Sequence, residues 1–324
     1  MTTFIKRREL LLGLAALPAS SRIAFAETYP SRPVRIIVAT SAGGGTDLVA
    51  RFIAQWLTER LGQSFVVENR TGAGGNIGTE AVVTAAPDGY TLLLATVPNA
   101  VNASLYTNLK FNFIRDIAPV AGIIRVPMFI MVHPSVPVKT VPELIAHAKA
   151  NPGKVNMASA GNGSAPHMAG ELFKMMTGID MVHVPYRGQG QALTDLLGGT
   201  VQVLFATAPG TTEYVTTGKL RALAVTTATR AQVLPDVPPV GDFVPGYETS
   251  QWYGMCAPGK TPTEIIEKLN KEINAAIVDA GMKARLAAIG GEPLPGTPAV
   301  FGKLIAEETE KWAKVVQAAG LKPE

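Results

Sequence analysis

The sequence is poor in the residues that metal and redox chemistry require. It has one cysteine, Cys256, and four histidines among 324 residues. A single cysteine cannot form an internal disulfide, and neither a Cys cluster nor an H-x-x-x-H pair is present to hold a metal. Cys256 lies in the apolar stretch 252–257 with no basic neighbour, so we expect a buried small side chain rather than a reactive thiol.

The chain also lacks an excess of charge of one sign once its N-terminal segment is set aside. The formal net charge is +4, from 29 basic and 25 acidic residues. Residues 1–26 hold four of the basic residues and one of the acidic ones, which leaves a net charge of +1 for the rest. No basic run with interleaved aromatic residues is present. A nearly neutral chain of this kind has no electrostatic footprint for nucleic acid.

Long hydrophobic runs are missing too, because the apolar segment Leu10–Leu17 is too short to cross a bilayer. Lys6 to Arg8 precede it and Ala24-Phe25-Ala26 follows it, an arrangement typical of an export signal. We therefore expect residues 1–26 to be removed near Ala26 and the mature chain to act in the periplasm. The signal contains no cysteine, which excludes a lipid anchor on a new N-terminal Cys. Its Arg-Arg pair leaves both twin-arginine and general secretory export open.

Strands and helices alternate along the rest of the chain. The β-branched run Val34–Ala39 predicts a buried strand, residues 41–46 a glycine-rich loop, and Asp47–Leu61 an amphipathic helix. Further strands are expected at 65–67 and 90–95. Strands that alternate with helices in this way predict an α/β fold with largely parallel sheets.

The same order of elements recurs after residue 125, which divides the chain into two parts. We expect two α/β lobes, one formed by residues 27–124 together with 250–324 and the other by residues 125–249. The chain would cross between the lobes near residues 125 and 250. From Thr261 onward the pattern is helical.

Four glycine-rich loops follow a strand and precede a helix, two in each predicted lobe. They span residues 41–46, 71–78, 161–164 and 186–190. In an open α/β sheet such loops lie at the carboxyl ends of the strands, where ligands bind, and the helix N-termini offer free N–H groups to an anion. Their Ser, Thr, Asn and Gly residues suit carboxylates better than polyphosphates. Neither a Walker A sequence nor a correctly spaced dinucleotide fingerprint is present, so no cofactor is expected.

Catalysis is the main alternative to binding. Ser164 and His167 lie three residues apart and could act as the nucleophile and base of a hydrolase. Ser164 is better placed to cap the helix that follows it, and no G-x-S-x-G elbow is present. We therefore expect a binding protein and not an enzyme.

Charged and aromatic residues beside the loops allow two interpretations each. We expect Asp47 to cap its helix and shape the first loop, and Arg70 to brace the second. Arg187 could either grip a carboxylate or brace its loop, and the sequence does not decide between these roles. Trp252 and Tyr253 lie near a predicted lobe crossing, where they can belong to the core or to a ligand wall.

In these loops the chain resembles the tripartite tricarboxylate transporter receptor family, also called Bug proteins. The matching segments, which cover essentially the whole mature chain, are residues 43–47, 69–78, 87–93, 184–188, 193–199 and 218–223. The resemblance implies a type II periplasmic-binding-protein fold with a ligand cleft between its lobes. It implies an extracytoplasmic receptor for a small organic carboxylate, with a small and a large membrane subunit as partners. An orphan or sensory carboxylate-binding role is the alternative, and we expect a monomer.

The resemblance also assigns candidate ligand-binding residues. Family members hold a ligand carboxylate largely with backbone amides and bridging waters from the first two loops, and the second lobe sets specificity. Matched by position, the candidates are Thr40, Ser41, Ala42, Gly43, Gly44, Gly75, Asn76, Ser164, His167, Arg187, Gly188 and Thr207.

The chain departs from the family pattern in two places. Thr40-Ser41 stand where an aromatic-Pro pair is usual, and Ala206 stands where an acidic residue that can meet a ligand amine is frequent. We therefore expect a mono- or dicarboxylate rather than an amino acid, and a dicarboxylate to bind better than the matching α-amino acid. An acidic side chain at position 206 should then weaken diacid binding, unless the position faces the core of the lobe.

Overall fold

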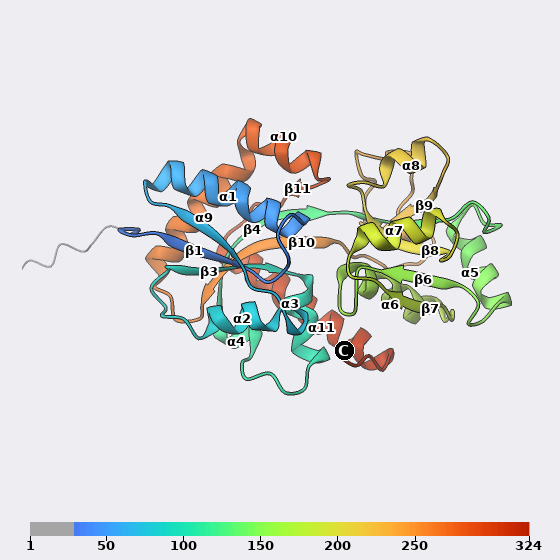
Figure 1. The fold of residues 1–324 in the computed structure, drawn as a ribbon, viewed down its shortest axis with the longest axis horizontal. Helices are drawn as coiled ribbons and strands as arrows, with labels where there is room; N and C mark the ends of the chain where they lie inside the picture. Colours follow the sequence, from blue (N-terminus) through green and yellow to red (C-terminus); the bar gives the residue numbers. More distant parts are fainter. Residues whose placement is uncertain (1–28, 324) are drawn as a thin grey trace, which may run out of the picture.

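Two separate β-sheets divide the structure, a computed structural model that describes residues 29–323, into two α/β lobes (Figure 1). The predicted export signal lies outside the described residues. The first sheet has the strand order β11-β4-β10-β3-β1-β2, and the second has the order β7-β6-β8-β5-β9. Helices cover both sheets, as an α/β fold requires.

Three parallel strands and the helices that follow them build one end of the first lobe. The strands are β1 (Val34–Val38), β2 (Phe65–Asn69) and β3 (Thr91–Thr96), and β1 pairs with both of the others. The helices are α1 (Gly45–Leu61), α2 (Asn76–Val83) and α3 (Val97–Leu105). Every residue of β3 is buried, because helices cover both faces of the parallel part of the sheet.

Two long strands carry the chain between the lobes. β4 (Ile117–Val126) belongs to the first sheet and β5 (Met128–Val132) to the second, so the chain changes sheets at Pro127. It returns between β9 (Arg221–Val225) and β10 (Gln251–Pro258), which pairs antiparallel with β3 and β4. The strands on either side of these two sheet changes form the hinge region between the lobes.

The second lobe repeats the strand-loop-helix order. Its parallel strands are β6 (Asn156–Ser159), β7 (Val182–Pro185) and β8 (Val203–Thr207), and β5 pairs antiparallel with β8. Its helices are α5 (Val141–Ala150), α6 (Ala165–Thr177), α7 (Gln189–Leu197) and α8 (Thr212–Thr216).

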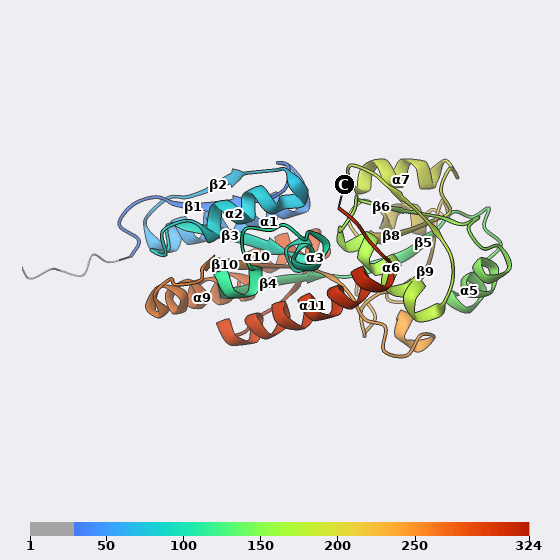
Figure 2. The same ribbon diagram turned by 90° about the horizontal axis from the view of Figure 1, so that it is seen from below.

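The C-terminal helices complete the first lobe and then reach the second. They are α9 (Thr263–Val278), α10 (Ala280–Ala288) and α11 (Pro298–Ala318). Figure 2 shows α11 running beneath the first lobe and ending beside α6, with which it makes contact. The remaining short elements are α4 (Phe113–Asp116), β11 (Glu292–Pro293) and the 3-10 turns η1 (Ala73–Gly75) and η2 (Val240–Asp242). Among residues 29–323, no helix is long and apolar enough to cross a membrane.

Aromatic residues of the hinge region belong to the core. Trp252 is 1% exposed, and its indole Nε1 and that of Trp312 both donate to the carboxylate of Glu308, at 3.1 and 2.8 Å. Cys256 is fully buried, and burial raises the pKa of its thiol, as expected for an inert side chain. Trp252 is therefore a core residue and not a ligand wall.

Candidate functional site

Three helices begin at one edge of the first sheet. Because β1, β2 and β3 are parallel neighbours, their carboxyl ends meet, and α1, α2 and α3 all start just beyond that edge. The first helical N–H groups of each have no partner within the helix, so this edge carries partial positive charge. A Thr96–Asn99 capping box closes the start of α3, whereas no side chain caps α1 or α2, so these two helices carry the uncapped starts at this edge.

The first loop, residues 40–44, is exposed and precedes α1. Gly44 is the N-cap of α1, and no side chain caps the helix, so the prediction that Asp47 is the cap is wrong. The carboxylate of Asp47 instead accepts hydrogen bonds from Gly43 N at 2.9 Å and from Asn69 Nδ2 at 3.1 Å. Arg51 also donates to it, at 2.8 and 3.1 Å, and lowers the pKa of Asp47 below its ordinary value. Asp47 thus shapes the loop from beneath and occupies the Gly43 amide.

Tyr253 supports the start of α1 from the hinge strand β10. Its hydroxyl hydrogen-bonds to Thr46, and a Cβ placed on Gly45 would lie 3.3 Å from that oxygen. Burial raises the pKa of Tyr253 to about 12, so the phenol stays neutral. The glycine at position 45 allows this close approach of the ring to the helix start.

The second loop needs glycine for its backbone conformation. Gly72, Gly74 and Gly75 have φ values of 119°, 63° and 93°, in the region that side chains with a Cβ avoid. Asn76 follows as the first residue of α2 and is 7% exposed. Its Oδ1 accepts from Asn102 Nδ2 at 3.0 Å, whereas its Nδ2 is buried without a partner. Arg70, which directly precedes the loop, donates to Glu68 of β2 at 2.7 Å.

Ser164 and His167 in the second lobe do not form a nucleophile and base. The Ser164 hydroxyl donates to Gly161 O at 2.6 Å and accepts from the backbone N–H of His167 at 3.4 Å, so it caps α6 as expected. The His167 ring turns the other way, and its Nδ1 accepts from Gly163 N at 3.1 Å. Because a backbone amide only donates, the imidazole proton lies on Nε2.

His167 belongs to a buried polar cluster behind its loop. Its ring stacks on His183 with 3.7 Å between centroids, and its Nε2 lies 3.7 Å from Glu171. Burial opposes ionisation of Glu171, but the contacts with His167 and Lys174 outweigh it and hold the pKa of Glu171 below its usual range. The cluster lines a cavity of about 380 Å³, and residues 319–322 also line it. His167 therefore faces the end of the chain.

Thr207 is held by a residue that sequence reasoning missed. Gln189, the first residue of α7, accepts both the Thr207 N–H and the Thr207 hydroxyl with its Oε1, each at 2.9 Å. Its Nε2 donates to the carbonyls of Thr207 and Pro209 at 3.3 Å. The glutamine thus joins the start of α7 to the loop after β8, and both donors of Thr207 are engaged.

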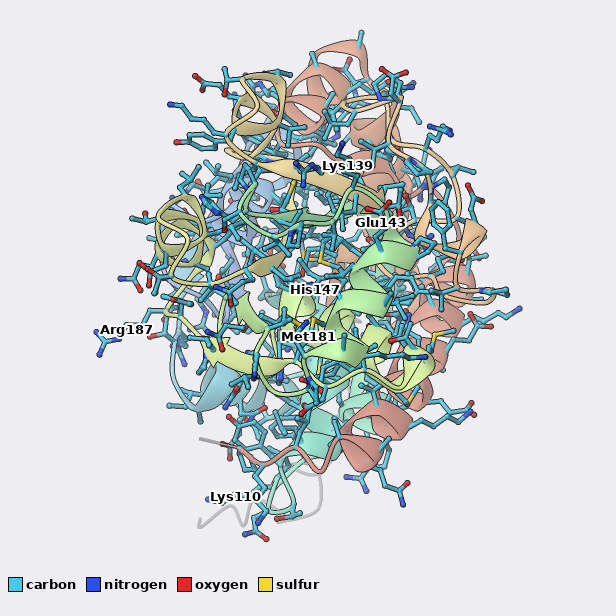
Figure 3. All side chains as sticks on the ribbon, turned by 90° about the vertical axis from the view of Figure 1, so that its right-hand side faces the viewer. Lys110, Lys139, Glu143, His147, Met181 and Arg187 are labelled. Atoms are coloured by element: carbon cyan, nitrogen blue, oxygen red, sulfur yellow. The ribbon has the colours of Figure 1, made fainter. Side chains whose placement is uncertain are left out.

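Arg187 and Gly188 lie at the same helix start. Gly188 is the N-cap of α7 and lacks a side chain that could cap it. Figure 3 shows Arg187 at the edge of the second lobe with its side chain extending away from the body of the protein. An uncapped helix start beside an extended guanidinium presents positive charge from the second lobe.

Ala206 does not face the loops, which corrects the basis of the expected ligand selectivity. It is fully buried in a core cluster with Leu204 and Phe129. Successive residues of β8 point to opposite faces, and Phe205 belongs to a different core cluster on the other side. An acidic residue at position 206 would enter the core rather than contact a ligand.

The two lobes touch where the loop before α6 meets α3. A Cβ placed on Gly163 would lie 3.1 Å from Leu105 Cδ2 and 3.8 Å from Asn102 Oδ1. Gly163 has a φ of 71°. Asn102 therefore lies between the second loop of the first lobe and the glycine-rich loop of the second.

No group of three or more His, Cys, Asp or Glu side chains within residues 29–323 is arranged to hold a metal ion.

Comparisons with known proteins agree with this architecture. The pattern described as the tripartite tricarboxylate transporter family receptor matches residues 49–321. Protein BugT of Bordetella pertussis is 39% identical over 300 residues, which cover 92% of each chain. The solved structure of R. palustris Rpa4515 with adipate is 38% identical, covers 91% of this chain and 100% of its own, and superposes with a TM-score of 0.81. MatC (Rpa3494) from Rhodopseudomonas palustris with bound malate is 31% identical, covers 89% and 100%, and has a TM-score of 0.78.

Proposed function

Because this chain belongs to the tripartite tricarboxylate transporter receptor family of periplasmic solute-binding receptors, we propose that it captures a small organic carboxylate between its two lobes. The observation that carries the proposal is the meeting of three helix starts at one sheet edge, with the buried and unpartnered Asn76 Nδ2 among them. Backbone N–H groups and an amide N–H are donors, and a carboxylate is an acceptor that satisfies several of them at once.

The first lobe binds the carboxylate in this proposal, and the second lobe completes the site. Thr40, Ser41, Ala42 and Gly44 offer backbone groups, while the Gly43 amide is committed to Asp47 and the Gly75 amide to Gly72 O. In the second lobe, the uncapped start of α7 at Gly188 meets the ligand, and Arg187, which extends away from the body of the protein in this structure, turns inward to reach it. Ser164, His167 and Thr207 act through the shape of their loops, because their hydrogen bonds join them to neighbouring protein groups.

A dicarboxylate fits this arrangement better than the matching α-amino acid. Each lobe presents a helix start to the space between them, and Arg187 adds a cation from the second lobe, so two anionic groups can be held while an ammonium is repelled. Two similar proteins are described with adipate and with malate, both of which are dicarboxylates. Ala206, which is buried in the core, has no part in this preference.

The wider biological role follows from the family and remains part of the proposal. Residues 27–124 with 250–324 and residues 125–249 act as two lobes that close on the ligand. Export depends on the signal in residues 1–26, with cleavage near Ala26. The mature monomer delivers its ligand to a small and a large membrane subunit, and an orphan or sensory role is the alternative. The ligand is bound and not converted.

A thermal-shift screen of mature protein, residues 27–324, against mono-, di- and tricarboxylates tests the proposal. A ligand that binds only the native state raises the melting temperature in a concentration-dependent way. Any acid that raises it is then incubated with the protein and recovered by mass spectrometry. We expect a shift with at least one dicarboxylate and its complete recovery. A flat response to every acid, or chemical conversion that is lost in Ser164→Ala, would contradict the proposal.

A further inference from the structure

A backbone carbonyl fixes the orientation of two side-chain amides in the first lobe. Asn102 donates from its Nδ2 to Gly74 O at 2.9 Å. A carbonyl oxygen can only accept, so the NH₂ end of the Asn102 amide must point toward Gly74. The same Nδ2 lies 3.0 Å from Asn76, and the atom of Asn76 that faces a donor must be the acceptor Oδ1.

The Asn76 amide group therefore turns its NH₂ end away from Asn102. The Nδ2 atom is buried and has no hydrogen-bond partner within the described protein. Burying an amide N–H without a partner costs free energy, because the water that would otherwise accept the hydrogen bond is lost. Asn76 is the first residue of α2. Its Nδ2 donor therefore lies at the end of the helix where backbone N–H groups lack intrahelical partners. An acceptor group of a ligand would satisfy it.

Further hydrogen bonds hold the helices that carry these two residues. Asn99 of α3 donates from its Nδ2 to Thr79 Oγ1 of α2 at 2.8 Å, and Thr79 donates to Gly75 O at 3.0 Å. Asn99 also accepts from Thr96 N at 2.8 Å at the start of α3. Gly74 has no room for a side chain, because a Cβ would lie 2.6 Å from the Tyr106 hydroxyl. The turn is thus fixed by contacts on both sides.

We propose that Asn102 is a positioning residue that, through its paired bonds to Gly74 O and Asn76 Oδ1, makes Asn76 a hydrogen-bond donor and so selects ligands with an acceptor at this point. The proposal rests on the carboxylate-binding function proposed above. Asn102 does not need to touch the ligand. Its own Oδ1 faces Gly163 of the second lobe, which places the residue where the lobes meet.

Two isosteric substitutions test the direction of the hydrogen bonds. Asn76→Asp keeps the acceptor for Asn102 but replaces the outward NH₂ with a second oxygen. Asn102→Asp removes the donor, so Asn76 is expected to turn its NH₂ toward residue 102 and its oxygen outward. In both variants an acceptor faces the ligand in place of a donor. Asn274→Asp is the matched control, because Asn274 makes similar backbone bonds in α9, away from the proposed site.

The probes are succinate, glutarate and adipate, each paired with its monoamide, and binding is measured by titration calorimetry. The monoamide carries N–H donors where the diacid carries only acceptors. We expect wild type and Asn274→Asp to prefer a diacid over its monoamide. Asn76→Asp should weaken that diacid about 10- to 100-fold, the equivalent of one charged hydrogen bond, and weaken the monoamide much less. Asn102→Asp should change the preference in the same direction.

The preference between the paired ligands separates positioning from a loss of folding, because a variant that is only destabilised weakens both members of a pair alike. If wild type binds the diacids and either variant retains the wild-type preference, Asn102 does not set the donor and the inference is wrong. If wild type binds none of the probes, the inference falls together with the proposed dicarboxylate function. Melting temperatures of all four proteins, measured in parallel, identify any variant that is unfolded. If one of the two Asn→Asp site variants is unfolded, the other one decides. A lost diacid preference in that variant supports the inference, and a retained preference contradicts it.

Discussion

Gln189 engages both hydrogen-bond donors of Thr207, the backbone N–H and the hydroxyl, with a single carbonyl oxygen at 2.9 Å. This pair joins the start of α7 to the end of β8, two elements whose loops belong to the proposed site. The loop after β8 therefore depends on a residue from a neighbouring segment 18 positions earlier. Substitution of Gln189 should affect ligand binding without direct contact between the glutamine and the ligand.

Gln189→Glu should weaken diacid binding more than it weakens the fold. The glutamate keeps an oxygen for the Thr207 donors but loses the N–H bonds to Thr207 O and Pro209 O, and it adds a negative charge at the start of α7. That charge interacts favourably with the helix dipole but repels a ligand carboxylate. We expect about a tenfold rise in the Kd of a diacid, equivalent to about 1.4 kcal/mol, with a melting temperature close to that of wild type.

Gln189→Ala is the control for this prediction. It removes all four side-chain hydrogen bonds of Gln189, the two accepted and the two donated, and should lower the free energy of unfolding by about 1–2 kcal/mol or more without introducing charge. Calorimetric titrations and urea unfolding of both variants separate the two effects. Equal diacid affinities in Gln189→Glu and wild type would show that the start of α7 does not meet the ligand.

Ala206→Asp should destabilise the protein whether or not ligand is present. Residue 206 is fully buried among apolar side chains, and an unpaired carboxylate there costs several kcal/mol or is forced to stay protonated. Ala206→Ser, which adds one small polar group, should cost less. Urea unfolding at pH 7 measures the decrease in the free energy of unfolding for both variants. A variant with wild-type stability and altered ligand preference would show instead that this position meets the ligand.

His183 should make the protein less stable in acid. Burial, reinforced by the neighbouring His167, lowers the pKa of His183 to about 3. The unfolded chain binds a proton on this residue at an ordinary pKa of about 6.5. Between these values the unfolded state holds more protons than the folded state, so the free energy of unfolding falls as the pH falls from 6.5 toward 3. The slope contributed by one such group is at most about 1.4 kcal/mol per pH unit.

His183→Gln isolates this contribution, because glutamine can keep a hydrogen bond to Ser159, which lies 2.6 Å from His183 Nε2. The pKa of Glu171 is lowered in the folded protein, so its ionisation also adds acid sensitivity. That effect is present in both proteins and cancels in the comparison. Urea midpoints at pH 7 and pH 4.5 should fall further for wild type than for the variant. If the urea midpoint falls equally in wild type and in the variant, His183 takes up its proton in the folded state as readily as in the unfolded state.

Local signals in the sequence predicted much of the architecture but not the side-chain partners. The strand-loop-helix order around Val34–Leu61 was readable because β-branched runs, glycines and helical periodicity are properties of short segments. Helix α3 was missed because residues 91–105 continue an apolar stretch without a glycine. Its start did carry a signal, a Thr96 and Asn99 capping box with Pro98 in the first turn.

The roles of individual polar residues depended on contacts that no local pattern contains. Asp47 was expected to cap α1, but Asn69 from the next strand and Gly43 from the loop compete for its oxygens. Gln189 and Asn102 belong to no recognisable sequence motif. Their hydrogen-bond partners Thr207 and Gly74 lie 18 and 28 residues away in the sequence. The family resemblance predicts His167 at the ligand, and the fold stacks its ring on His183 in a cavity that residues 319–322 also line, which no local pattern around His167 indicates.

The central claim is that the two lobes capture a dicarboxylate between them. Small-angle scattering of the mature protein with and without a dicarboxylate tests this claim most directly, because capture requires the lobes to approach each other. Binding shifts the population toward the state that contacts the ligand from both sides. The ligand is one that thermal shift has identified, and calorimetry sets a concentration at which the site is filled. We predict a smaller radius of gyration at saturation, and a smaller decrease in Asn76→Asp at the same ligand concentration. A radius of gyration that stays constant in wild type at proven saturation would contradict capture between the lobes.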